Sequence, residues 1–211
     1  MPPPADNAIL CTMKHIALIL MMTATPALAT PEYVLPTLFD VTGVAADDVL
    51  NVRAEPTAQA EILSTLQPGA TRIEVVQEQD GWGRVNTGEG SGWVSMRYLN
   101  YRTDVWQDGR LPDGFRCYGT EPFWDARVSG GDLVIGMPDV PETRLPVSDI
   151  LGSGYFRDPA KAVMAAGATL TATPAICSDG MSDQLFGLRA DLAISGQDRL
   201  LSGCCTIQPA D

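Results

Sequence analysis

Three acidic side chains stand in the sequence where they could do chemistry. Glu121 follows Cys117 closely, and Asp179 and Asp183 follow Cys177. Paired carboxylates act as general acid and base on a glycosidic bond, and clustered carboxylates bind hard cations such as calcium. The glycine after Asp179 is equally typical of a turn, in which Asp and Ser side chains accept backbone hydrogen bonds. We expect a structural role and keep open two alternatives, a calcium-type site and a catalytic pair formed by Glu121 and Asp183.

The N-terminal segment has the order of a secretory signal peptide. Met13-Lys14-His15 is a short positive start, 16–22 is an unbroken apolar run, and Ala27-Leu28-Ala29 resembles a cleavage site. The apolar run is too short to span a membrane, so no integral membrane segment should remain after cleavage. Residues 1–12 are proline-rich without a positive charge, so we expect Met13 to be the true start. The signal region is then 1–29, followed by a short leader at 30–37.

Cleavage after Ala29 would leave a chain without histidine, because His15 is the only histidine in the sequence. Such a chain cannot form a Ser-His-Asp or Cys-His pair or a histidine-based zinc site. No glycine-rich phosphate-binding motif is present. The net charge of −12 argues against nucleic acid as a partner, because few basic residues are available to contact phosphates. We therefore lean towards a protein that is not an enzyme and has no metal, cofactor or nucleic-acid partner.

Four cysteines follow the signal region, and an even count in an exported protein favours disulfide bonds. A bond between the neighbours Cys204 and Cys205 would be strained, since adjacent strand residues point to opposite faces. We predict that Cys117 pairs with one of these two and Cys177 with the other. The alternative is a soft-metal or redox site at Cys204 and Cys205.

The chain after the leader consists of short strand-like segments separated by turns. The first set of these segments lies in residues 38–101. Alternating apolar and polar residues with Gly-containing turns are typical of an all-β domain. This segment resembles a bacterial SH3 (SH3b) domain, on the motifs Leu50-Asn51-Val52-Arg53 before Pro56, Leu66-x-Pro68-Gly69, Gly81-Trp82 with Arg84-Val85, and Gly92-Trp93-Val94 ending in Tyr98-Leu99. The resemblance implies a small β-barrel that targets or binds, often on cell-wall peptides, and it does not imply catalysis.

Barrels of this kind bind extended peptides on aromatic faces, which gives a set of candidate ligand residues. Arg53 has an alternative role, because its guanidinium can satisfy local carbonyls. We expect Trp93 to lie in the core rather than in the groove. The candidate ligand-binding residues are Asn51, Arg53, Glu55, Trp82 and Tyr98.

After a polar linker at 102–114, residues 115–208 predict a second, disulfide-linked antiparallel β-sandwich or barrel. We expect a long loop at 138–146, one short helix at 159–166, and Phe123 and Trp124 in the core. This half resembles a family of exported or membrane-associated bacterial proteins of uncharacterised function. The resemblance lies in the motifs Cys117-x-Gly119-x-Glu121-Pro122-Phe123-Trp124, Cys177-x-Asp179-x-Met181-Ser182-Asp183 and Leu201-x-Gly203-Cys204-Cys205.

The sequence therefore predicts an all-β, periplasmic or secreted binding protein whose partner is a cell-wall peptide or an envelope protein. One alternative is a carboxylate-dependent hydrolase of envelope glycans that uses Glu121 and Asp183. The other is a structural or interaction protein without wall contact, in which the SH3-like barrel docks on the second domain.

Overall fold

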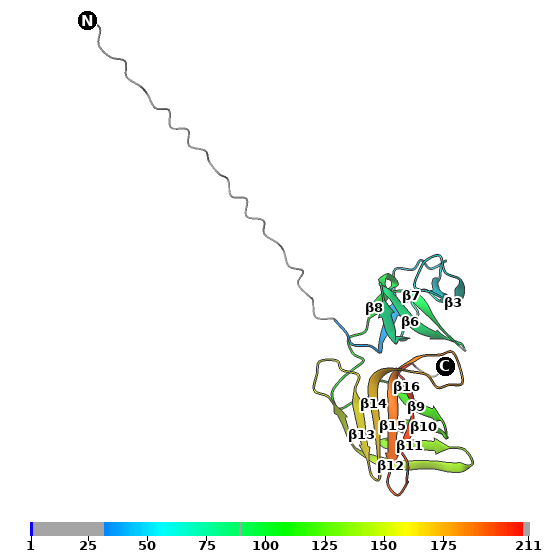
Figure 1. Ribbon diagram of the computed structural model, residues 1–211. Coiled ribbons are helices and arrows are strands. Elements are labelled where there is room, and N and C mark those ends of the chain that lie inside the picture. The colour runs from blue at the N-terminus through cyan, green and yellow to red at the C-terminus, as the bar shows by residue number, and fades with distance from the viewer. Residues whose placement is uncertain (2–31, 89, 209–211) are drawn as a thin grey trace. The chain divides into compact units, whose positions relative to one another are not determined.

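The structure is a computed structural model that describes residues 32–88 and 90–208 together with Met1 (Figure 1). The predicted signal peptide and the start at Met13 lie outside the described residues. The chain divides into two units, Met1–Pro31 and Glu32–Asp211, and all the strands that the structure describes belong to the second. Among the described residues, no helix is long and apolar enough to cross a membrane, and the helix present there is a single 3₁₀ turn, η1 (Met96–Tyr98).

The first half of this unit consists of two small antiparallel sheets. One has the strand order β4-β1-β8, and the other has the order β3-β2-β7-β6-β5. Their bounds are β1 Thr37–Val41, β2 Leu50–Arg53, β3 Ile62–Leu66, β4 Ile73–Val75, β5 Gln77–Gln79, β6 Trp82–Thr87, β7 Gly90–Ser95 and β8 Leu99–Tyr101.

Alternation along these strands builds the first core, as the sequence predicts. Leu50 and Val52 of β2 are buried, whereas the residues between and after them are half-buried. Positive φ angles at Asp80 and Gly81 allow the tight turn that joins β5 to β6. Trp93 is buried, which confirms its expected place in the core.

The second half is a closed eight-stranded barrel with the order β10-β11-β12-β13-β14-β15-β16-β9, in which every pairing is antiparallel (Figure 1). The expected all-β architecture is confirmed, with a barrel as the form of the second domain. The bounds are β9 Arg116–Thr120, β10 Phe123–Ser129, β11 Asp132–Met137, β12 Val140–Gly152, β13 Lys161–Ala165, β14 Ala168–Cys177, β15 Phe186–Ile194 and β16 Leu201–Thr206.

Large apolar side chains fill the interior of this barrel, including Leu133, Leu170, Leu188 and Leu192. Trp106, from the segment expected to be a linker, packs against the same cluster. Its indole N–H donates a hydrogen bond of 2.7 Å to the carbonyl of Pro36. Segment 102–114 is therefore partly built into the packed structure.

Two predictions of local structure are wrong. The proline-rich stretch 138–146 belongs mostly to β12. Proline has no N–H to donate to a sheet, and Pro146 lies next to an irregularity in the pairing, between Val147 and Asp149, where proline is tolerated. The expected helix at 159–166 is strand β13, because Lys161 and Val163 turn inward while the backbone pairs on both sides. Pairing with neighbouring strands overrides the helical preference of this short segment.

The expectation that Phe123 lies in the core is also wrong. Phe123 and Trp124 are neighbours on β10, so their side chains point to opposite faces. Trp124 is buried, as expected, whereas Phe123 is 52% exposed. Its ring is therefore available to the surface of the barrel.

Candidate functional site

Four of the five candidate ligand residues line one pocket in the SH3-like half. This pocket has a volume of about 540 Å³, and its walls include Asn51, Arg53, Trp82 and Tyr98. Glu55 does not line it. The remaining wall residues come largely from the loop before β2 and from the end of β7: Gly43, Val44, Ala45, Asp48, Val49, Leu50, Ala58, Ser95 and Arg97.

Three separate elements position these side chains. Asn51 and Arg53 turn away from the core because Leu50 and Val52 of the same strand turn towards it. Trp82 begins β6 directly after the tight turn. Tyr98 ends η1, which follows β7. Strand alternation and two chain reversals therefore bring distant residues to one hollow.

Two guanidinium groups give this pocket its positive character. Arg53 donates a hydrogen bond of 2.7 Å to the carbonyl of Ala60, so the local role considered above exists. A guanidinium has five N–H donors, and Arg53 can therefore also serve a ligand. Arg97 lies 4.9 Å from the ring centroid of Tyr98, a cation–π arrangement. Sequence reasoning missed Arg97, although its position beside Tyr98 could have indicated it.

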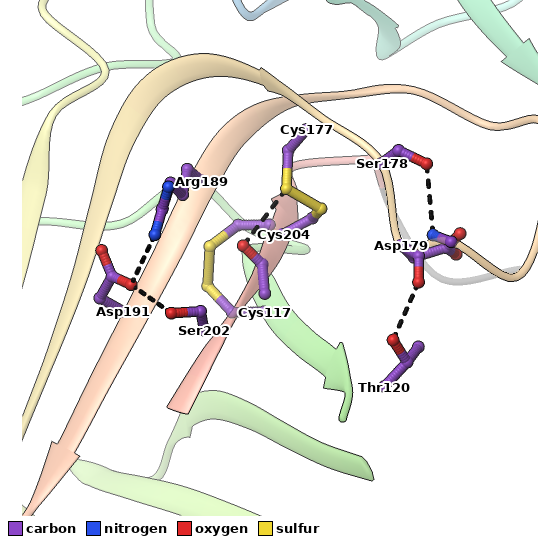
Figure 2. The surroundings of a disulfide bond; sticks show 12 residues. Cys117, Thr120, Cys177, Ser178, Asp179, Arg189, Asp191, Ser202 and Cys204 are labelled. Atoms are coloured by element: carbon purple, nitrogen blue, oxygen red, sulfur yellow. Dashed lines mark hydrogen bonds and ion pairs between the residues drawn. A yellow bond between two sulfur atoms is a disulfide. The ribbon is translucent and has the colours of Figure 1, made fainter. Parts of the chain in front are cut away.

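The cysteines of the second half form two disulfide bonds, Cys117–Cys205 and Cys177–Cys204 (Figure 2). The predicted disulfides and the opposite use of Cys204 and Cys205 are confirmed. Cys117 and Cys205 lie opposite each other on β9 and β16, inside the barrel core. Cys204 reaches instead to Cys177 at the end of β14.

Close packing explains two glycines of the motifs. A Cβ on Gly119 would overlap the indole nitrogen of Trp124, which donates a hydrogen bond of 3.2 Å to the carbonyl of Ser202. A Cβ on Gly203 would overlap the carbonyl oxygen of Tyr118. These glycines allow β9, β10 and β16 to approach closely.

The acidic residues separate into different settings. The Asp179 carboxylate accepts hydrogen bonds from the backbone N–H of Met181 at 2.9 Å and of Ser182 at 3.1 Å. Its carbonyl accepts one of 2.9 Å from the Thr120 hydroxyl (Figure 2). Asp179 therefore organises a turn, which is the expected structural role.

Glu121 and Asp183, the acid and base of the hydrolase hypothesis, line two different pockets. Asp183 lies near the β6–β7 turn of the SH3-like half, where Gln184 donates to the carbonyl of Gly88. Within residues 32–88 and 90–208, no three His, Cys, Asp or Glu side chains gather as a metal site requires. The geometry therefore lends no support to either the catalytic pair or the cation site.

The three motifs of the second half nevertheless meet around one pocket of about 680 Å³. The first motif contributes Glu121 and Phe123, the second Asp179 and Met181, and the third Gly203. Burial raises the pKa of Tyr118, which also lines this pocket, above its usual range. The motifs thus build a concave surface at one place on the barrel.

Comparisons with known proteins identify one part of the chain. No curated protein and no solved structure matches it. The resemblance inferred for residues 115–208 finds no support in these comparisons. Residues 48–100 match the family model of the bacterial SH3 domain, a range that includes the four predicted ligand residues of the pocket. This part of the chain is therefore a bacterial SH3 domain.

Proposed function

We propose that this protein is an exported, non-enzymatic binding protein whose bacterial SH3 domain engages a cell-envelope ligand. The ligand is a peptidoglycan peptide or an envelope protein. One observation carries the proposal: four of the candidate ligand residues, Asn51, Arg53, Trp82 and Tyr98, line a single pocket of about 540 Å³.

The chemistry of the pocket favours an extended peptide that carries a carboxylate. Trp82 and Tyr98 offer ring surfaces for aliphatic side chains. Arg53 and Arg97 offer charged donors for carbonyl or carboxylate oxygens, and such charge-assisted bonds are stronger than neutral ones. Asp48 also lines the pocket, and its carboxylate accepts the N–H of Val49 at 2.8 Å.

Two further features support export. The chain holds two disulfide bonds, which persist in oxidising compartments such as the periplasm. The signal-peptide pattern of residues 13–29 agrees with this location. We therefore place the working protein in the periplasm or outside the cell.

A co-sedimentation assay tests the proposal with purified peptidoglycan sacculi and the mature protein, residues 30–211. We expect retention at moderate salt, and loss of retention for Trp82→Ala and for Arg97→Ala. Arg199→Ala, at an exposed arginine between β15 and β16, is the matched control and should be retained. Sacculi stripped of their stem peptides by an amidase should retain less protein. Equal retention of all variants, or none by a folded wild type, would contradict wall binding through this pocket.

A second candidate is an interaction protein in which the SH3 domain docks on the barrel and does not contact the cell wall. Buried contacts between the two halves favour it: Leu38 packs into the barrel cluster, and Glu74 accepts hydrogen bonds from Thr206 and Ile207. If this candidate holds, folded wild type and the Trp82→Ala and Arg97→Ala variants should all fail to be retained on sacculi.

A further inference from the structure

The pocket at which the three barrel motifs meet is a first hollow on the barrel, and a second hollow lies beside it. This neighbour has a volume of about 570 Å³ and shares Tyr118, Gly119, Thr120 and Phe123 with the first. Phe123 therefore stands between two adjoining depressions. Together they form one groove, which we name the motif groove, lined among others by Glu121, Phe123, Val140, Ile176, Asp179 and Met181.

Exposed apolar side chains gather along the motif groove. Phe123 is 52% exposed, Ile176 50%, Val140 57% and Met181 68%. Large apolar groups left in water at one concave place mark an interaction surface rather than ordinary surface scatter. Met side chains adapt to different partners, and an aromatic ring supplies a rigid contact.

The charges along the motif groove are mostly negative. Glu121 and Asp179 line the first hollow, and Asp125 and Glu142 line the second. Arg127 pairs with the latter two at 3.2 Å and 2.6 Å. Arg189 also lines the first hollow, and its guanidinium lies 3.6 Å from the Asp191 carboxylate. Among the described residues, Glu121 forms no such ion pair. A ligand with a positive charge beside an apolar group therefore complements the groove, whereas an anionic ligand does not.

The barrel is closed, so the groove offers no free strand edge to which a peptide could add. Recognition must come from side chains that enter the two hollows. We propose that the motif groove is a second binding site, distinct from the SH3 pocket, for an extended protein segment that carries a large apolar residue next to lysine or arginine. The apolar residue packs on Phe123, and the cation pairs with Glu121.

Selection of peptides tests this proposal. The probe is a phage-displayed library of random seven-residue peptides, panned on immobilised mature protein. We expect enriched peptides that combine a large apolar residue with lysine or arginine. Their affinity should fall about tenfold or more in Phe123→Ser and about threefold in Glu121→Gln, and it should weaken as salt rises.

Two controls separate this site from other surfaces. Leu200→Ser removes another exposed apolar side chain, outside the lining of the groove, and should leave the affinity unchanged. Trp82→Ala in the SH3 pocket should also leave it unchanged. Failure to enrich peptides that combine a large apolar residue with lysine or arginine, or equal binding of such peptides by Phe123→Ser, would overturn the proposal. Loss of binding in Trp82→Ala would assign the peptides to the SH3 pocket and overturn it too, whereas the sacculus assay is judged independently.

Discussion

Replacing Glu74 with glutamine should remove a pH dependence of stability that this one carboxyl group creates. Glu74 lies on β4 and is only 2% exposed. Its Oε2 accepts hydrogen bonds from the Thr206 hydroxyl and, at 3.3 Å, from the N–H of Ile207. Within residues 32–88 and 90–208, its Oε1 has no hydrogen-bond partner. A charge at this position would therefore be poorly compensated.

Burial raises the pKa of Glu74 to about 7, and the hydrogen bonds from Thr206 and Ile207 oppose this rise only in part. Arg116 lowers the pKa slightly through its charge, and the other titratable group that faces Glu74 is Tyr118. The unfolded chain has the ordinary value of 4.5. Because the folded pKa is the higher one, the folded state holds more protons between these values, and stability falls as pH rises through them.

The expected size follows from linkage. A shift from 4.5 to about 7 corresponds to a maximum of about 3 kcal/mol, most of which is lost between pH 5 and pH 8. Other groups titrate in this range in both proteins, so the difference between wild type and Glu74→Gln isolates the Glu74 contribution.

Urea denaturation of the two mature proteins from pH 5 to pH 8 measures this difference. From pH 5 to pH 8, the free energy of unfolding of wild type should fall by about 2–3 kcal/mol more than that of Glu74→Gln. Glu61→Gln, at an exposed residue, is the control and should run parallel to wild type. Parallel curves for wild type and Glu74→Gln would refute the reasoning, since the carboxyl group would then have the same pKa folded and unfolded.

Three further predictions concern the packed parts of the unit. Thr206→Val removes the hydroxyl donor to Glu74 and should lower the free energy of unfolding by about 1–3 kcal/mol, measured by urea denaturation at pH 7; no loss would mean that the hydrogen bond contributes nothing net. Gly119→Ala should lower it by about 1–3 kcal/mol because the new methyl group meets the Trp124 indole, and an unchanged Tm would contradict this packing. Mild dithiothreitol should reduce Cys177–Cys204 before Cys117–Cys205, since Cys177 lines an open pocket whereas Cys117 and Cys205 are fully buried. Alkylation followed by peptide mapping should therefore label Cys177 and Cys204 first. Early labelling of Cys117 would contradict this order and show that the barrel opens.

The sequence predicted best those features that follow from the two-residue alternation of side chains along a β-strand. In β2, alternation placed Leu50 and Val52 inside and Asn51 and Arg53 outside, and this orientation built the SH3 pocket. The same alternation separated Cys204 from Cys205 and restricted their partners. These inferences succeeded because they depend only on the local geometry of a strand.

Features that depend on contacts between residues far apart in the sequence could not be predicted in this way. Residues 161–165 resemble a short helix until β12 and β14 pair on either side of them. In the alternating pattern of β4, Glu74 occupies a position typical of an exposed residue. Its burial depends on the end of β16, which packs over it. Ile176 gave no signal, and Met181 was visible only as a member of a motif, because only the closed barrel brings both residues to the side of Phe123.

The central claim is that the SH3 pocket receives a peptide of the cell envelope. The most direct measurement is the change in backbone amide NMR shifts of the labelled mature protein on titration with soluble peptidoglycan fragments that retain their stem peptides. The largest changes should cluster at Asn51, Arg53, Trp82 and Tyr98 and saturate together, and they should be absent in Trp82→Ala. Changes confined to residues outside this pocket, or no changes with a folded protein, would contradict the claim.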